Sequence, residues 1–148
     1  MDKKTGNYPY VTASEGNNSI AGYVDFDTEQ IEEGNCISIG GKTMVVTYQS
    51  KDYVSNDSHN LALYIDDIRG RTEKAQLFIV SAIKSALSHK YTWGDSISKS
   101  KIKSDKIMLP VTDSGNIDFE YMEEYITAIE KTVMVNVLNV INNETSTQ

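Results

Sequence analysis

The last third of this chain reads Ile107-Met108-Leu109-Pro110-Val111, then Asp113-Ser114-Gly115-Asn116-Ile117-Asp118, then Tyr121-Met122-Glu123-Glu124-Tyr125-Ile126. The apolar first segment predicts a short strand, and its proline, which lacks a backbone donor, predicts that the strand ends there. The polar second segment predicts a turn, and the third begins a long amphipathic helix. This order predicts a globular domain that meets a partner through a C-terminal helix, and it has no pattern typical of an active site.

Length and composition are ordinary for one globular domain with its own hydrophobic core. The chain has 148 residues, of which 39% are hydrophobic and 24% charged. Residues 1–6 contain no apolar signal core, and no apolar run reaches the roughly 18–20 residues needed to cross a bilayer. We therefore expect a cytoplasmic protein. Its one cysteine, Cys36, excludes an intramolecular disulfide, and the alternating pattern around it predicts a buried thiol in a strand.

The net charge of −7 argues against nucleic acid as a partner, but the charge is unevenly distributed. Six lysines and two aspartates lie between Lys84 and Lys106, so this segment is locally basic. Seven acidic residues and one lysine follow, from residue 107 to the end. A basic face of this kind binds phosphates locally, with weak and salt-sensitive non-specific affinity.

Runs of β-branched and aromatic residues predict strands at residues 8–12, 20–26, 35–39, 44–48, 61–65 and 107–111. Apolar residues at helical spacing predict a helix that is capped by Thr72 and ends near His89. The expected fold class is α+β: a twisted, mostly antiparallel β region packed on a central helix, followed by a C-terminal amphipathic helix that mediates assembly. We assign residues 1–112 to a recognition domain and residues 113–148 to the C-terminal helix with a disordered tail.

The final helix carries an apolar seam. Asp118 is positioned to cap this helix, and acidic residues follow in its first turn. The expected assembly surface consists of Phe119, Met122, Ile126, Ile129, Val133, Val137 and Val140, the first five at spacings of three, four, three and four. Packing on the helix's own domain is the better interpretation for the first half. From Val133 onward apolar residues lie on more than one side, which favours a partner helix.

Patterns typical of catalysis or metal binding are missing. The run Gly40-Gly41-Lys42-Thr43 lacks the first glycine and the loop length of a phosphate-binding P-loop. Asp25, Asp27 and Glu29 alternate like calcium ligands, but the glycine and the terminal glutamate of such a loop are absent. Two histidines and one cysteine cannot form an ordinary zinc site, and His59 is expected to tie down its own loop. We expect a protein that is not an enzyme and that binds no metal or cofactor.

Residues suited to DNA lie in the basic segment and in polar loops. Lys99, Lys101 and Lys103 follow Tyr91 and Trp93, so the lysines could hold phosphates while an aromatic ring stacks on bases. Trp93 could equally anchor its loop to the core. Side chains of the type that contact base edges or a groove are Asn17, Asn18, Lys42, Thr43, Gln49 and Asn56. Asparagine is also a common turn residue, so each position alone has a structural explanation.

The segments that carry a family resemblance are, in chain order, Tyr8-Pro9-Tyr10-Val11-Thr12, Gly22-Tyr23, Gly34-Asn35-Cys36-Ile37-Ser38-Ile39-Gly40-Gly41, Val46-Thr47-Tyr48-Gln49, Ser58-His59-Asn60-Leu61, residues 76–87, Tyr91-Thr92-Trp93-Gly94 and Lys106-Ile107-Met108-Leu109-Pro110-Val111. Gly115-Asn116-Ile117-Asp118, Met122-Glu123 and Tyr125-Ile126 close the pattern. In this order they resemble a target recognition domain from the specificity (S) subunits of type I restriction-modification systems, in its type IIB-like variant. The resemblance covers nearly the whole chain.

This resemblance implies a non-catalytic subunit that reads one half of a bipartite double-stranded DNA target. Its partner would be a DNA methyltransferase subunit, which flips and methylates adenine with S-adenosylmethionine, while the specificity subunit binds no cofactor. Most members carry two recognition domains, so a chain with one is expected to form a homodimer through its C-terminal helix. The acidity of the chain, unusual for a DNA reader, leaves a second class open: a stand-alone, phage-borne or truncated specificity-like protein that inhibits or redirects a methyltransferase or nuclease.

Overall fold

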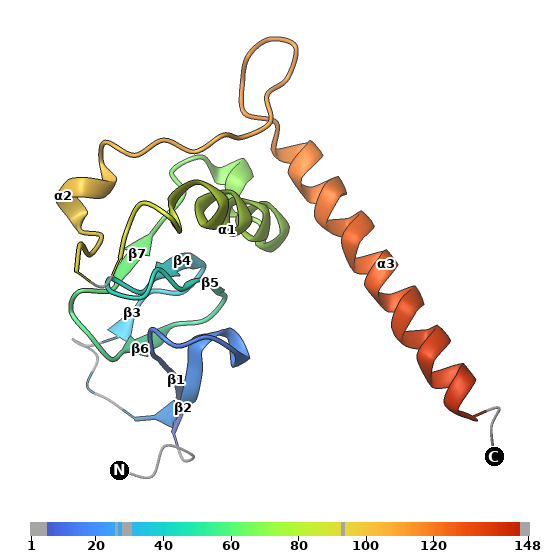
Figure 1. The fold of residues 1–148 in the computed structure, drawn as a ribbon, viewed down its shortest axis with the longest axis horizontal. Coiled ribbons are helices and arrows are strands. Elements are labelled where there is room, and N and C mark those ends of the chain that lie inside the picture. The colour runs from blue at the N-terminus through green and yellow to red at the C-terminus, as the bar shows by residue number, and fades with distance from the viewer. Residues whose placement is uncertain (1–5, 26, 28–30, 93, 146–148) are drawn as a thin grey trace.

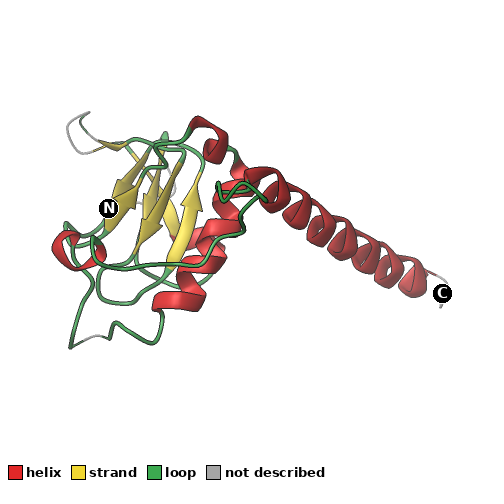
Figure 2. Cartoon of the chain, turned by 90° about the horizontal axis from the view of Figure 1, so that it is seen from above, coloured by secondary structure: helices red, strands yellow, loops and turns green. Residues whose placement is uncertain are grey.

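A computed structural model describes residues 6–25, 27, 31–92 and 94–145 of the chain. Two small β-sheets form the body, and helix α1 (Glu73–Leu87) packs across one of them. Helix α3 (Phe119–Thr145) leaves the body as a long arm (Figure 1, Figure 2). The structure confirms the predicted α+β class, with a β region packed on a central helix and a long C-terminal helix.

The first sheet has the strand order β2-β1-β6-β3. Its strands are β1 (Tyr8–Val11), β2 (Ile20–Val24), β3 (Ile31–Glu32) and β6 (Tyr53–Ser55). β1 pairs antiparallel with β2 and parallel with β6, and β3 pairs antiparallel with β6. β3 and β6 are absent from the sequence-based prediction, because strands of two and three residues carry no readable alternation.

The second sheet has the order β5-β4-β7 and is antiparallel throughout. It consists of β4 (Cys36–Ile39), β5 (Val46–Gln49) and β7 (Leu61–Leu63). Every residue of β4 is buried, because this strand is covered on both faces. Ile37 and Ile39 belong to the cluster under α1, whereas Cys36 packs with β1 and β6 of the first sheet. The β region is therefore mostly antiparallel, as predicted.

Burial makes Cys36 a structural residue. Its side chain is fully buried beside Tyr53, and the hydroxyl oxygen of Tyr53 lies 3.8 Å from Cys36 Sγ. Burial raises the pKa of the Cys36 thiol, since a thiolate would be poorly solvated there. The thiol therefore stays protonated, which fits the expectation of a buried cysteine in a strand.

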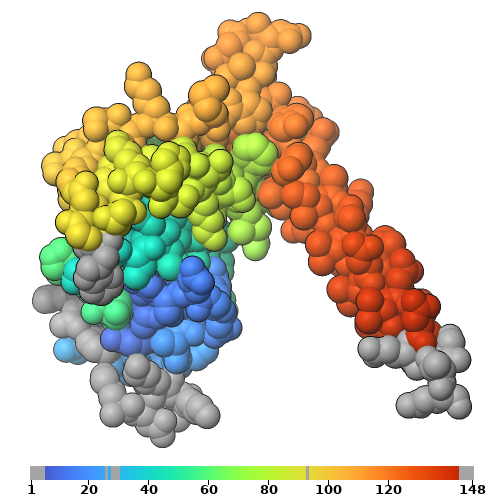
Figure 3. Space-filling view, in the orientation of Figure 1, coloured from blue at the N-terminus to red at the C-terminus, as the bar shows by residue number. Residues whose placement is uncertain are grey.

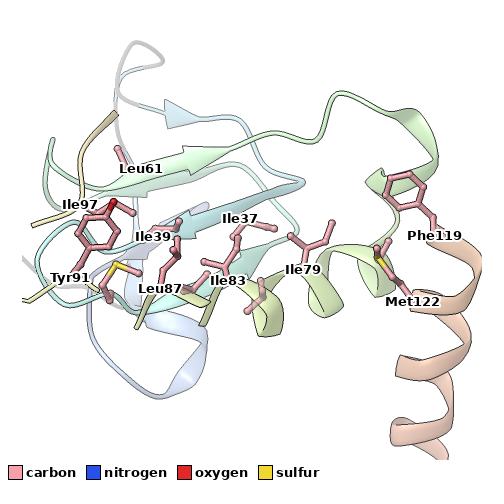
Figure 4. Close-up of a cluster of buried hydrophobic side chains, with 14 residues drawn as sticks. Ile37, Ile39, Leu61, Ile79, Ile83, Leu87, Tyr91, Ile97, Phe119 and Met122 are labelled. Atoms are coloured by element: carbon pink, nitrogen blue, oxygen red, sulfur yellow. The ribbon is translucent and has the colours of Figure 1, made fainter. Parts of the chain in front are cut away.

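Helix α1 begins and faces the sheet as its sequence predicts. Thr72 caps it by accepting a hydrogen bond at Oγ1 from the backbone N–H of Ala75. Ile79, Ile83 and Leu87 recur at helical spacing and point toward the second sheet (Figure 4). The helix ends at Leu87, two residues before the predicted end.

The prediction of a strand at Ile107–Val111 is wrong. Among the described residues this segment has no strand neighbour, and an isolated bridge joins Val111 to Ile117. Ile107 and Leu109 pack on the main core, while Met108 and Val111 are exposed. The alternation that resembles a strand therefore reflects a chain laid across the core, where β propensity is satisfied without a pairing partner.

Helix α3 begins where Asp118 was expected to cap it, since Asp118 Oδ1 accepts from the N–H of Tyr121 at 3.0 Å. Phe119 and Met122 are buried in the main core, at the end of α1 that begins with Glu73 (Figure 4). These two residues therefore anchor the helix to its own domain, which agrees with the interpretation that the first half of the helix packs there. The helix continues through Thr145, and the rest of the predicted disordered tail lies outside the described residues.

Candidate nucleic-acid interface

Three loops converge at one end of the second sheet. The turn between β4 and β5 is closed by hydrogen bonds from Met44 N to Gly40 O and from Gly40 N to Val45 O. A Cβ added at Gly41 would lie 2.2 Å from the carbonyl oxygen of His59, so the two backbones touch. A Cβ added at Gly40 would meet the side chain of Ala13 at 2.7 Å. Both glycines are therefore required for close approach of the three loops.

A polar network holds the loop between β6 and β7 against this turn. Asp57 Oδ1 accepts from the backbone N–H of His59 at 2.9 Å and contacts His59 Nδ1 at 2.6 Å. Lys42 Nζ donates to Asp57 Oδ2 at 3.4 Å. These bonds from the backbone and ring of His59, with the Lys42 ammonium, lower the pKa of Asp57 to about 2. His59 thus ties down its own loop, as predicted.

Asn60 joins the same two loops through its amide. Its Oδ1 accepts from the backbone N–H of Gly41 at 3.2 Å, and its Nδ2 donates to Ser55 Oγ and to Asn56 Oδ1, both at 3.0 Å. The side chain is half-buried between the loops. The position of the exposed Asn56 side chain therefore depends on Asn60.

Adjoining hollows connect these loops into one polar strip. The first hollow is lined by Lys99 together with Asn56, Asp57 and Asn60, and the second contains the same three loop residues with Lys42 and Thr43. The third hollow shares Thr43 with the second and also contains Asn18 and Lys84. Each hollow thus combines a lysine and at least one acidic side chain with uncharged polar side chains. The lysines are suited to holding phosphates, and the uncharged polar groups to reading bases.

Lys84 was not among the sequence-based candidates. It lies on α1, and its place beside Asn18 and Thr43 depends on how α1 packs over β5. Its only sequence signal is membership of the basic segment, which it shares with five other lysines.

The basic segment itself is only partly free to bind phosphate. Within the part of the chain that the structure describes, Lys90 pairs with Asp105 and Lys101 pairs with Asp95. Lys101 Nζ also donates to the carbonyl oxygen of Ser96 at 2.9 Å. Lys99 and Lys103, at the two ends of the short helix α2 (Lys99–Ile102), are exposed and make no ion pair there.

Asp105 fixes the base of this segment. Its side chain is only 3% exposed and bonds both the Lys90 ammonium and the Tyr91 hydroxyl, the latter at 2.5 Å. Burial alone would raise the pKa of Asp105, but the bonds from Lys90 and Tyr91 outweigh it and lower that pKa. Trp93, the expected stacking residue, lies outside the described residues.

The remaining sequence-predicted candidates have structural bonds. Asn17 and Asn18 have positive φ in the 3-10 turn Asn17–Ser19, and their amides donate to the carbonyl oxygens of Ile20 and Tyr48. Gln49 is 2% exposed, and its Nε2 donates to Asn18 O and to Thr47 Oγ1. The amide of Gln49 is thus occupied inside the protein, away from the surface that a DNA base could reach.

Among the described residues, side-chain bonds join α3 to the body near the start of the helix. Thr72 Oγ1 donates to Glu123 Oε1 at 2.8 Å, and Lys74 Nζ bonds Thr127 Oγ1 at 2.8 Å and Glu130 Oε2 at 2.9 Å. Beyond Glu130 the described side chains of the helix are exposed, and the body does not cover this part of the arm in Figure 3.

The part of α3 beyond Glu130, which the body does not cover, carries exposed apolar side chains. Val133, Val137 and Val140 are each more than half exposed, and Ile129 is 44% exposed. Ile126 and Ile129 also line a groove between α1 and α3, whose aromatic wall is formed by Phe78, Tyr121 and Tyr125. Five of the seven residues of the expected assembly surface, all except Phe119 and Met122, are therefore at least partly accessible.

The described ranges contain no cluster of three His, Cys, Asp or Glu side chains that could hold a metal ion. Within those same ranges, none of the helices combines the length and the apolar character needed to cross a membrane.

Comparison with known proteins identifies the family of this chain. Residues 1–139 match the family described as Type I restriction modification DNA specificity domain. The "Type II restriction enzyme BgcI specificity subunit S.BcgI" of Heyndrickxia coagulans is 25% identical over 139 residues, which are 90% of this chain and 38% of that protein. The chain thus spans less than half the length of this curated relative, and no solved structure matches it. Because the family match extends over residues 1–139, the protein belongs to the type I restriction-modification DNA specificity domain family.

Proposed function

We propose that this chain reads one half of a bipartite double-stranded DNA target for a restriction-modification methyltransferase and is itself not catalytic. The observation that carries the proposal is the strip of adjoining hollows, in which Lys84, Lys42 and Lys99 alternate with exposed polar side chains. Membership of the DNA specificity family supports it. The DNA-containing cytoplasm is where this function would operate.

The lysines of the strip would hold the DNA backbone. Lys99 lines the strip at the start of α2, and Lys103 directly follows this helix; both are exposed and form no ion pair among the described residues. Lys101 and Lys42 would contribute less, because Asp95 and Asp57 already pair with them. With a net charge of −7 for the whole chain, long-range attraction to DNA is absent, and these local contacts must supply the phosphate binding.

The polar side chains between the lysines would read the bases. Asn56 and Thr43 are exposed in the central hollows, and Asn18 is exposed in the neighbouring one. Asn17 lies beside Asn18 and is also exposed. Amide and hydroxyl groups can donate to and accept from base edges, whereas lysines aimed at phosphates carry no sequence information.

The two parts of the chain would have different roles. Residues 1–112 would form the DNA target recognition domain, and residues 113–148 would serve assembly. Because Phe119 and Met122 belong to the domain core, the assembly surface proper would begin at Ile126. Val133, Val137 and Val140 would pair with the same helix of a second copy, and the paired helices would dock the methyltransferase subunit.

A homodimer would suit a bipartite target. A two-fold axis between the arms would present two identical polar strips, and these would read two symmetric half-sites at a fixed spacing. The length of α3, 27 residues or roughly 40 Å, would set that spacing.

The test is a fluorescence-anisotropy titration of the purified protein against a randomised duplex pool at low and physiological salt, with the bound fraction sequenced. Enrichment of a short motif, together with weaker binding by Lys99→Glu, would support a DNA reader. Absence of binding even at low salt would contradict the proposal. That result would favour the alternative, a specificity-like protein that binds a methyltransferase or nuclease and inhibits or redirects it.

A further inference from the structure

The orientation of the Asn60 amide is determined by its neighbours. The backbone N–H of Gly41 can only donate, so the atom of Asn60 that faces it at 3.2 Å must be the oxygen. The hydroxyl of Ser55 donates to the carbonyl oxygen of Asp57, which leaves Ser55 Oγ to accept from Asn60. Both constraints place the NH₂ group of Asn60 toward Ser55 and Asn56.

The orientation of Asn56 follows from that of Asn60. Because the NH₂ group of Asn60 donates at 3.0 Å, the Asn56 atom that receives it must be Oδ1. The NH₂ group of Asn56 is then the end of the amide that is left to meet a partner in the adjoining hollows. The backbone N–H of Gly41 therefore fixes the orientation of the Asn60 amide, and Asn60 in turn fixes the orientation of the exposed Asn56 amide.

Asn56 occupies the position in the strip where a base contact is best supported. It is exposed and lines both hollows, one of which contains Lys99 and the other Lys42. A phosphate held by the exposed Lys99 would leave the uncharged amide of Asn56 beside it to meet the base edges.

We propose that Asn60 is a positioning residue that holds the Asn56 amide with its NH₂ group outward, so that Asn56 selects a keto base, guanine or thymine, in the major groove. This inference rests on the proposed function. Guanine O6 and thymine O4 are acceptors, whereas adenine N6 and cytosine N4 are donors. An outward NH₂ group aimed at this exocyclic position, rather than at the N7 acceptor that both purines share, therefore discriminates between the two classes of base.

The test is the half-site selected by Asn60→Asp. The carboxylate of the variant still accepts from Gly41, but it can no longer donate to Asn56. The Asn56 amide then rotates to donate to the carboxylate and exposes Oδ1, an acceptor. We expect one position of the enriched motif to change from a keto to an amino base on the same strand, by about five- to tenfold, while the other positions stay unchanged.

A second variant reaches the same result by another route. In Asn56→Asp the new carboxylate accepts from Asn60 and exposes an acceptor, so the same position should show the same exchange without any change at Asn60. Ser58→Asp is the matched control, because it adds a negative charge to an exposed site in the same loop. It should weaken binding without changing any base, and circular dichroism would establish that all three variants fold.

The outcomes separate this inference from the proposed function. If the wild-type protein enriches a motif and either folded aspartate variant of Asn60 or Asn56 enriches the identical motif, the positioning role is overturned while the DNA-reading function stands. If Ser58→Asp produces the same exchange, charge rather than amide orientation is responsible, and the inference is likewise overturned. If the wild-type protein enriches no motif, both proposals are overturned.

Discussion

The ring of Phe119 lies directly against the backbone of Gly70: a Cβ added at Gly70 would be 2.4 Å from Phe119 Cε1. The guanidinium of Arg69 lies 5.5 Å from the centre of the same ring. This contact joins the short 3-10 helix before α1 to the first residue of α3. The direction of the arm therefore depends on a glycine far from it in the sequence.

Replacing Gly70 by alanine should destabilise the domain. The added methyl group would displace the Phe119 ring from the core, at a cost of about 1–3 kcal/mol in the free energy of unfolding. Urea denaturation followed by circular dichroism would measure the change. Gly94→Ala is the control, because a Cβ at Gly94 meets no atom within 4 Å. Equal stability of both variants would contradict the packing at this junction.

The starts of α1 and α3 could be predicted because their sequence signals are local. Thr72 and Asp118 cap their own helices through bonds to residues three positions ahead, and the apolar spacing of α1 specifies the buried face. The strands β3 and β6 could not be predicted in this way. β6 is defined by its parallel pairing with β1, more than forty residues away in the chain, and only the tertiary fold creates that pairing.

In the candidate site, too, local features could be predicted from the sequence, whereas features that depend on the tertiary fold could not. Polar loops and a basic segment were visible in the sequence, and several of those residues line the strip. The sequence could not distinguish the exposed amide of Asn56 from the buried amide of Gln49, because the difference is which way each loop or strand faces. It also could not show that Asp95 neutralises Lys101 while Lys99 is left unpaired, since that depends on the folded loop.

Lys99 and Lys101 should differ when each is replaced by alanine. Lys99→Ala should weaken duplex binding and reduce the slope of log affinity against log salt by about 1, without changing the melting temperature. Lys101→Ala should have a smaller effect on binding but should lower the melting temperature by about 1–3 °C, because it removes the bonds to Asp95 and Ser96. Anisotropy at several salt concentrations and thermal denaturation would measure both effects. The opposite order would show that Lys101 leaves Asp95 to contact phosphate.

The loop between β6 and β7 should keep its structure in acid. The pKa of Asp57 is lowered to about 2, so the contribution of its carboxylate is complete above about pH 4 and is lost as the pH falls through about 2. The backbone amide shift of His59, followed by NMR from pH 6 to pH 1.5, should therefore show a midpoint near 2. His59→Ala should raise the pKa of Asp57, read from its own side-chain carbonyl signal, because one bond to the carboxylate is lost. In Asp57→Asn the transition of the His59 amide should disappear; a wild-type midpoint near the ordinary value would contradict the network.

The bare end of α3 should drive self-association. Val133 and Val137 are one turn apart on the exposed apolar face, so a Val133→Glu/Val137→Glu variant would place two charges in a helix–helix interface. We expect its dimer affinity to fall by at least about tenfold, measured by sedimentation equilibrium, with the melting of the domain unchanged. Asn139→Glu is the matched control, since Asn139 is an exposed polar residue on the same arm, away from the apolar residues at 133, 137 and 140. Loss of association by the control, or a wild-type chain that stays monomeric at high concentration, would show that the apolar arm does not bind a second copy, and a methyltransferase subunit would remain its expected partner.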